Sequence, residues 1–301
     1  MLNRFYSANE HYRRRFGEKI YKLALAFGRT CPNRDGTAGT GGCIFCGGSG
    51  SGEFAESCAK GVDAAIEAAK RRVASEVGHG RFIAYFQSFT STYMPIGEME
   101  KVFFAAAERE DIAALSVATR PDCLPDDTVK LLGKLAEIKP LYVELGLQTI
   151  HEDTAKKINR GYALPVYRDA VKKLHSVGAD VITHIILGLP GESADMAEET
   201  ATYVGKISDG VKLQLMFVLE GTRLAEMYER GEYRPLTREE YTETLCRCVE
   251  VLPPSVVIHR LTGDPPKRLL VAPEWAADKK RVLGMIAEAF KRRNTIQGSR
   301  A

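Results

Sequence analysis

The feature of this 301-residue sequence that most constrains its fold is the regular alternation of short β-rich runs with longer helical segments. Six runs carry the apolar and β-branched residues typical of strands, at residues 20–26, 81–86, 112–118, 141–147, 180–187 and 211–217. Helical patterns lie between them near residues 60–77, 97–110, 125–138, 151–178 in two pieces, and 193–209. Because no hairpin turns join the strands, the sequence predicts right-handed βαβ crossovers and a parallel sheet covered by helices.

The last three strand-like runs place polar side chains on one face. Side chains alternate along a strand, so Glu144 shares a face with Gln148, and Lys212 shares a face with Gln214. In the run 180–187, His184 shares a face with Ile182 and Ile186. A closed eight-stranded barrel fills its centre with branched apolar side chains, whereas a partly polar lining favours a wider lumen that holds a ligand. We therefore predict an α/β fold, a partial (β/α)6 TIM-like barrel.

The chain is expected to divide into three regions. A basic N-terminal arm covers residues 1–19, the barrel core covers 20–217, and a C-terminal extension over 218–301 packs on the barrel. In the extension, the sequence predicts a helix over 237–252, a strand over 255–261 and a basic helix over about 275–293.

Charge is distributed unevenly along the chain, although its net value is only +3. Residues 1–22 contain six Lys and Arg against two acidic residues, and residues 267–301 contain nine against three, so the middle is acidic. The longest apolar stretch, 181–189, is far shorter than the ~20 residues of a membrane helix. Charged residues precede any apolar segment at the N-terminus, unlike in a secretory signal, so we expect a cytoplasmic protein without a membrane partner.

Three of the seven cysteines lie in a glycine-rich loop directly after the first expected strand. Cys31, Cys43 and Cys46 have the spacing C-x11-C-x2-C. Thiolates this close in sequence can bind one metal centre, and glycine lets the backbone fold tightly around a bulky cofactor. A four-iron cluster held by three thiolates keeps one iron open for catalysis. The alternatives are a structural zinc site with Cys58 as fourth ligand, and unligated structural thiols.

The position of this loop favours the catalytic cluster, because barrel active sites are built at the C-terminal ends of the strands. The loop, together with segments 87–93, 119–122, 144–148, 159–162, 187–192 and 258–264, resembles the radical S-adenosylmethionine (SAM) superfamily. Within it, the chain is most similar to the YhcC/YtqA-like family, which is related to the Elongator catalytic subunit. The chain also resembles oxygen-independent coproporphyrinogen oxidase.

The resemblance implies the cofactors and their ligands. A [4Fe-4S] cluster, held by Cys31, Cys43 and Cys46, would chelate SAM at its open iron and cleave it to a 5′-deoxyadenosyl radical that abstracts hydrogen from a substrate. The electron would come from a reductant such as flavodoxin or ferredoxin. The protein positions SAM and excludes water and oxygen.

The resemblance also implies residues that bind SAM. Phe45 would pack near the adenine, and Gln87 and Ser88 would bind the amino group. Gln148 and Arg160 match SAM-binding residues of coproporphyrinogen oxidase, and Arg160 would pair with the SAM carboxylate. Two residues on the inner strand faces complete this expected set, Glu144 beside Gln148 and His184 at the place of a ribose-binding residue.

The candidate substrate residues are Cys123, Lys212, His259, Arg260 and Asp264. Two further cysteines, Cys246 and Cys248, fall two residues apart on an expected helix, point apart, and receive no metal. The sequence assigns no oligomeric state.

Three functions are consistent with these features. The resemblance implies tRNA wobble-uridine modification, at the step from carboxymethylaminomethyl to aminomethyl, and the basic ends could contact phosphates. A narrow polar lumen would also suit radical chemistry on a small metabolite. The third alternative is a non-catalytic iron–sulfur or zinc protein that binds RNA.

Overall fold

The computed structural model describes residues 4–50, 52–74 and 80–301. Its main sheet contains eight parallel strands in the order β2-β1-β3-β4-β5-β6-β7-β9. The strands are β1 (Tyr21–Ala26), β2 (Glu56–Ser57), β3 (Phe82–Phe86), β4 (Ile112–Thr119), β5 (Leu141–Gln148), β6 (Asp180–Leu187), β7 (Gly210–Leu215) and β9 (Val257–Arg260). A separate antiparallel pair is formed by β8 (Val218–Leu219) and β10 (Leu270–Ala272).

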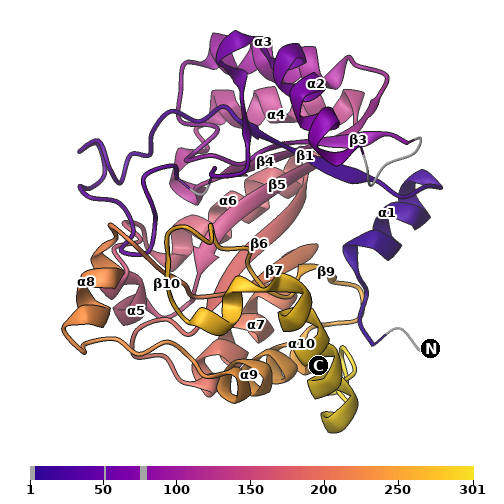
Figure 1. The fold of residues 1–301 in the computed structure, drawn as a ribbon. Coiled ribbons are helices and arrows are strands. Elements are labelled where there is room, and N and C mark those ends of the chain that lie inside the picture. Colours follow the sequence, from indigo (N-terminus) through magenta and orange to yellow (C-terminus); the bar gives the residue numbers. More distant parts are fainter. Residues whose placement is uncertain (1–3, 51, 75–79) are drawn as a thin grey trace.

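Helices cover the outer face of the curved sheet (Figure 1). The helices are α1 (Ala8–Phe16), α2 (Val62–Val73), α3 (Ile96–Ala107), α4 (Asp126–Ile138), α5 (Glu152–Lys157), α6 (Leu164–Ser176), α7 (Ala194–Gly205), α8 (Arg223–Glu229), α9 (Arg238–Val251) and α10 (Lys279–Arg293). Those that pack on the outer face are α2, α3, α4, α6, α7 and α9. Short 3-10 turns are η1 (Cys58–Lys60), η2 (Pro121–Cys123) and η3 (Glu274–Ala277). Within the described part of the chain, no helix combines the length and apolarity needed to cross a bilayer.

The six expected strands are all present, as β1 and β3 to β7, and the predicted partial barrel is confirmed. Two further strands extend the sheet. At one edge β2 is only two residues long, too short for a sequence pattern to reveal it. At the other edge β9 pairs with β7 through the register Gly210↔Val257, which protects an edge that would otherwise be unpaired. The region after residue 217 therefore contributes a strand to the barrel as well as packing on it.

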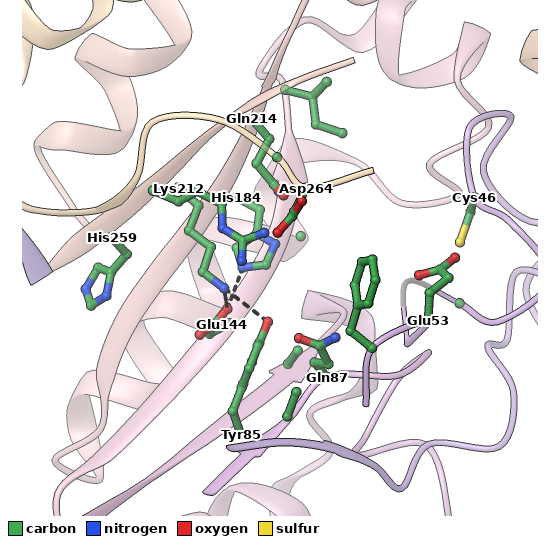
Figure 2. A pocket seen from close by; sticks show the side chains of 18 of the residues that line it. Cys46, Glu53, Tyr85, Gln87, Glu144, His184, Lys212, Gln214, His259 and Asp264 are labelled. Atoms are coloured by element: carbon green, nitrogen blue, oxygen red, sulfur yellow. Dashed lines mark hydrogen bonds and ion pairs between the residues drawn. The ribbon is translucent and has the colours of Figure 1, made fainter. Parts of the chain in front are cut away.

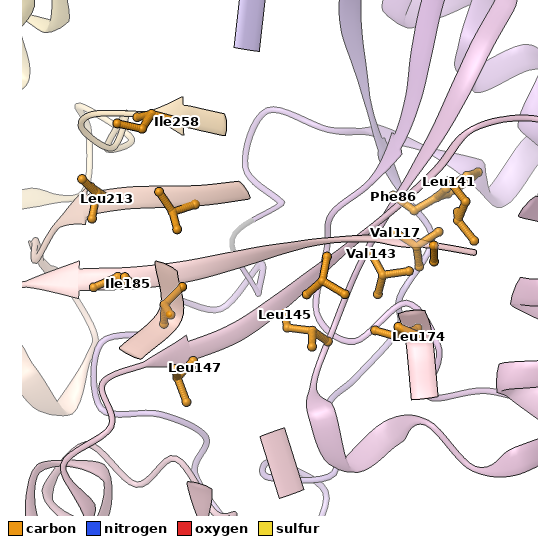
Figure 3. Close-up of a cluster of buried hydrophobic side chains, with 14 of the residues drawn as sticks. Phe86, Val117, Leu141, Val143, Leu145, Leu147, Leu174, Ile185, Leu213 and Ile258 are labelled. Carbon is orange, nitrogen blue, oxygen red and sulfur yellow. The ribbon is translucent and has the colours of Figure 1, made fainter. Parts of the chain in front are cut away.

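The apolar core lies between the outer face of the sheet and the helices (Figure 3). On β5, Val143, Leu145 and Leu147 are fully buried in this core, together with Leu174 of α6. Each such side chain contributes roughly 1.5–3 kcal/mol through burial of apolar surface. The alternate residues of β5 point to the other face, so the same strand builds both the core and the lumen.

Helix α1 of the N-terminal arm closes the lumen at the N-terminal end of the strands. Ser7 caps α1 by accepting a hydrogen bond from the Glu10 amide, and the helix ends at Gly17 with a left-handed φ of 77°. Tyr12 of this helix is 3% exposed, and its hydroxyl lies 3.3 Å from Nδ1 of His259 on β9. The arm therefore acts as a floor for the lumen.

Candidate active site in the barrel lumen

A cavity of about 740 Å³ runs along the inner face of the sheet, from the cysteine loop to α1. Strands β1, β3, β4, β5, β6, β7 and β9 all contribute side chains to its wall. Figure 2 shows Cys46 and Glu53 on one side of this cavity, and Lys212, Glu144 and His184 on the other, with Gln87 between them. Polar side chains on the inner faces of β5, β6 and β7 line the lumen, as the alternation predicted.

The structure brings Cys31, Cys43 and Cys46 to the wall of this one cavity. The loop folds back through short main-chain hydrogen bonds, from the Arg34 amide to the Cys31 carbonyl at 2.8 Å and from the Cys46 amide to the Cys43 carbonyl at 3.1 Å. Gly42 adopts a φ of 71°, and a Cβ there would lie 2.9 Å from the Arg34 side chain. Glycine at this position thus permits the close approach of the loop to Arg34.

Two arginines lie near the three cysteines, and neither was singled out from the sequence. The guanidinium of Arg34 donates to the carbonyls of Cys46 (2.7 Å) and Gly47 (2.6 Å). Arg120, 8% exposed, is held by Asp122 and donates to the Arg160 carbonyl at 2.9 Å. Arg120 and Asp122 both lie in segment 119–122, one of the segments that carry the resemblance. Their spacing of two residues was the sequence signal that could have indicated this ion pair.

Burial and charge act in opposite directions on these thiols. Burial raises the pKa of Cys43 to about 12, with Cys46 adding to the shift and the charge of Arg120 opposing it. Burial also raises the pKa of Cys46, while Arg34 opposes the rise through its charge and a hydrogen bond. Metal ligation needs thiolates and releases the protons of the thiols. A bound metal centre, Arg34 and Arg120 would therefore all favour the thiolate form of these cysteines.

The other cysteines are placed elsewhere. Cys58, expected in the zinc alternative as a fourth ligand, is not among the residues that line the cavity and packs against the hydrophobic core. Cys123 also differs from expectation, because it is buried and lines a separate pocket outside the lumen, next to Pro32 and Pro121. Both Cys246 and Cys248 are buried in α9.

The residues of the lumen fit a cluster with one open iron better than they fit a single zinc ion. Among residues 4–50, 52–74 and 80–301, no three His, Cys, Asp or Glu side chains converge on one ion position, whereas structural zinc needs four ligands at about 2.0–2.3 Å. A four-iron cluster binds each thiolate through a different iron, so its ligands stand further apart. Three thiols on one wall match that requirement.

The lumen also contains a buried polar atom, Oε1 of Gln148, which fits the binding of SAM beside the cluster. This atom has no hydrogen-bond partner in the part of the chain that the structure describes. The residue lines the cavity and adopts a φ of 71°, which is strained for a residue with a side chain. A Cβ on Gly146 would lie 2.9 Å from its amide nitrogen. The amide of Gln148 is therefore held in the lumen with a free acceptor.

Glu144 lies at the centre of a buried charge cluster. It is 1% exposed and accepts from Lys22 (2.7 Å), from Ser116 (2.8 Å) and from Lys212. Nε2 of His184 lies 2.7 Å from its second oxygen. Burial alone would raise the pKa of Glu144, but the charges of Lys212 and Lys22 hold it well below 4.5.

The partners of Glu144 lose protons more readily than usual. Burial lowers the pKa of Lys212 to about 7, an effect that Glu144 opposes and Lys22 reinforces. Burial and the charge of Lys212 lower the pKa of His184 to about 4, so this imidazole is neutral at pH 7. One carboxylate thus balances two lysines, and Lys212 is the group that titrates near neutrality.

Two of the expected SAM-binding residues have their polar groups occupied by the main chain. The hydroxyl of Ser88 donates to the Gly28 carbonyl at 3.2 Å, and Ser88 does not line the cavity. Arg160 is 1% exposed, and its guanidinium donates to the carbonyls of Thr149 (2.6 Å) and Tyr162 (3.0 Å). Arg160 lines the cavity as expected, and these hydrogen bonds hold its guanidinium against the turn after β5.

The remaining expected residues all line the cavity. They are Phe45, Gln87, His259, Arg260 and Asp264. Asp264 forms an ion pair with Lys279 at 2.8 Å. Among the residues that sequence reasoning missed, Tyr85 accepts a hydrogen bond from Lys212 at 3.0 Å, and Lys22 reaches Glu144 from β1.

Comparisons with known proteins agree with this geometry. A family model described as the Radical SAM superfamily matches residues 26–204, and one described as the Radical_SAM C-terminal domain matches residues 208–292. The chain is 42% identical to the uncharacterized protein YtqA of Bacillus subtilis, over 98% of this chain and 92% of that protein. It is 32% identical to a tRNA uridine(34) acetyltransferase of Methanocaldococcus infernus, over 58% of this chain and 32% of that protein.

A solved structure shares the fold. The archaeal Methanocaldococcus infernus Elp3 with an N-terminal deletion has a TM-score of 0.70 and 21% sequence identity, over 92% of this chain and 64% of that chain. At this level of identity, the similarity shows a common architecture of sheet and helices.

Proposed function

This chain belongs to the radical SAM superfamily, and on that premise we propose that it modifies transfer RNA at the wobble uridine. The chain is a radical SAM enzyme, and the family uses a [4Fe-4S] cluster and SAM. The predicted class and cofactors are thereby confirmed, and the non-catalytic alternative is not supported. When bound, these groups supply a 5′-deoxyadenosyl radical that takes a hydrogen atom from the substrate.

The chain's own residues would hold these groups in the lumen. We assign the cluster to Cys31, Cys43 and Cys46, with Arg34 and Arg120 compensating the charge of the thiolates. The free Oε1 of Gln148 is an acceptor suited to a donor group of SAM. Apolar Phe45 beside the cysteines is suited to the adenine ring.

The observation that carries the tRNA assignment is that a basic helix borders the cavity. Asn9 and Lys19 are exposed and line the cavity, and they flank the run Arg13, Arg14 and Arg15 of α1. A polyanion bound along this helix would lie beside the part of the cavity wall that Asn9 and Lys19 form. The relative that carries tRNA uridine(34) acetyltransferase as its name supports this assignment.

Within this function, we propose the step from a carboxymethylaminomethyl to an aminomethyl substituent on the uridine. The C–N bond to the carboxymethyl group would break with uptake of water, the two-carbon unit would leave as glyoxylate, and SAM would take up the two electrons released as it is cleaved to methionine and 5′-deoxyadenosine. Radical SAM enzymes need a reductant, and we propose a flavodoxin or ferredoxin in that role. The small lumen would admit the substituted base alone, so the nucleotide would have to leave its stack before reaction.

The test is a comparison of tRNA from cells with and without the gene, followed by reconstitution. The tRNA from cells without the gene is then incubated in the absence of oxygen with the reconstituted protein, SAM and dithionite. We expect the missing nucleoside to appear together with 5′-deoxyadenosine, and neither to appear with Cys43→Ala. Identical nucleoside profiles in the two strains would contradict the tRNA assignment. Stimulation of 5′-deoxyadenosine release by a small-molecule extract, and not by tRNA, would support the metabolite alternative.

A further inference from the structure

A row of basic side chains crosses three neighbouring strands on the inner face of the barrel. Lys212 of β7 pairs in register with His184 of β6 and with Arg260 of β9. All three residues line the cavity. In Figure 2, Lys212 and His184 lie on the opposite side of the cavity from Cys46. This row is therefore separate from the loop where the cluster would bind.

The row carries more positive than negative charge. In the described part of the chain, Glu144 is the one acidic side chain that pairs with Lys22 and Lys212. Asp264, which also lines this region, is already paired with Lys279. Since the pKa of His184 is about 4, this residue adds no charge at pH 7. Two lysines and Arg260 thus face a single carboxylate.

Arg260 is the member of the row whose charge is uncompensated. Across residues 4–50, 52–74 and 80–301, its guanidinium has neither a hydrogen bond nor an ion pair, although it lines the cavity. Its charge is near enough to lower the pKa values of Lys212 and His184. An unpaired guanidinium at the wall of a partly enclosed cavity presents a fork of N–H donors that matches the oxygens of a carboxylate or phosphate.

We propose that this row binds an anionic oxygen group of the substrate, a carboxylate or a phosphate, with Arg260 as the principal donor and Lys212 beside it. The inference rests on the proposed function, because the bound group belongs to the molecule on which the radical acts. Tyr12 closes the floor of the lumen, so the anionic group enters as the end of a substituent, and a nucleic-acid backbone stays outside.

Binding of small probes to the protein without its cluster tests the proposal directly. Acetate and inorganic phosphate are titrated by calorimetry, with acetamide as the uncharged control. We expect an anion to bind and acetamide not to bind. Arg260→Gln should weaken the binding by about tenfold or more, because a hydrogen bond to a charged group is lost. Arg281→Gln, an exposed cation on α10, should leave it unchanged.

The preferred probe identifies the chemical source of the anion. Tighter binding of acetate assigns a carboxylate, and tighter binding of phosphate assigns a phosphoryl group. Equal affinity of wild type and Arg260→Gln would overturn the proposal, as would the binding of neither anion. Displacement of acetate by L-methionine would also overturn it, because the row would then hold the carboxylate of SAM.

A second readout follows the proton on Lys212. The groups that face it are Glu144, Tyr85, Lys22, His184 and Arg260. An anion bound nearby raises the pKa of Lys212 above about 7, so binding at pH 8 should take up a fraction of a proton. The heat of binding should therefore depend on the ionisation enthalpy of the buffer, and Lys212→Met should abolish that dependence.

These measurements use no tRNA and no SAM turnover, so they separate this inference from the proposed function. Anion binding with no change in tRNA nucleosides would leave the inference in place and contradict the tRNA assignment. Modified tRNA together with unaltered anion binding in Arg260→Gln would contradict the inference alone. Far-UV circular dichroism of Arg260→Gln verifies that the variant folds.

Discussion

Individual cysteines of this chain differ in what surrounds them, and this difference leads to the first prediction. Cys43 lines the lumen beside Arg120, whereas Cys58 packs on the apolar core. We expect Cys43→Ala to lower the iron content of the anaerobically reconstituted protein from about four atoms per chain to near zero. Cys58→Ala should keep its iron. Loss of iron in both variants, with zinc in the wild type, would instead favour the four-cysteine site.

The central carboxylate of the charge cluster should be important for stability. Replacing Glu144 by Gln leaves two buried or half-buried lysines facing one another without a counter-ion. We expect Glu144→Gln to lower the free energy of unfolding by about 3 kcal/mol, measured by urea denaturation. The control is Glu98→Gln, whose exposed pair with Arg29 should contribute less than about 1 kcal/mol. A double-mutant cycle with Lys212→Met should show strong coupling.

The pH dependence of stability follows from His184. Its pKa in the fold is about 4, below the ordinary 6.5, because burial and Lys212 disfavour the charged form. Between pH 6.5 and 4 the unfolded chain therefore binds a proton that the folded chain does not. Stability should fall with decreasing pH across this window, by up to about 1.4 kcal/mol per pH unit for this residue. His259 has a lowered pKa and acts in the same direction.

Denaturation curves at pH 7, 6, 5 and 4.5 measure this slope. His184→Gln should make the curve flatter over the same window. An unchanged slope in that variant would show that other groups dominate the acid response.

At the scale of elements, the turn that follows β5 depends on a buried arginine. Arg160 donates to main-chain carbonyls on both sides of this turn, at Leu147 (3.2 Å) and Thr149 (2.6 Å). We expect Arg160→Met to lower the free energy of unfolding by about 2–4 kcal/mol, because buried carbonyls lose their donor. Arg168→Met, at an exposed pair on α6, should change it little. Unchanged stability with weaker SAM binding would restore the role that the resemblance implied.

Strand periodicity explains why much of the lumen could be predicted. The alternation of β5 separates Glu144 from Val143 and Leu145, and the same rule places Lys212 in the lumen. The sequence does not reveal which side-chain donors are occupied by hydrogen bonds to main-chain carbonyls, as the guanidinium of Arg160 is. The join of β9 to β7 also depends on contacts between residues distant in the chain, which no local pattern records.

At the scale of the whole molecule, the two basic ends of the chain meet. Phe5 packs edge-on against Phe290 with ring centroids 6.1 Å apart, and Arg4 donates to the Thr295 carbonyl at 3.1 Å. In Figure 1 the segment that leads into α1 lies beside α10. The sequence showed that both ends are basic, but their juxtaposition follows only from the fold.

The joined ends lead to the last prediction, on binding of tRNA. Lys291 and Arg292 are exposed on α10 and make no ion pair within the described residues, whereas exposed Arg234 is paired with Glu240 at 2.7 Å. If the basic ends contact phosphates, the double variant Lys291→Gln and Arg292→Gln should weaken binding of bulk tRNA for all sequences. It should also reduce the slope of log K against log salt by about one to two, since each lost contact releases one counter-ion fewer. Arg234→Gln is the matched control and should keep the slope, because Glu240 already neutralises this charge. An equal effect of both variants would mean that net charge alone sets the affinity, and it would contradict a specific contact between tRNA and the joined ends.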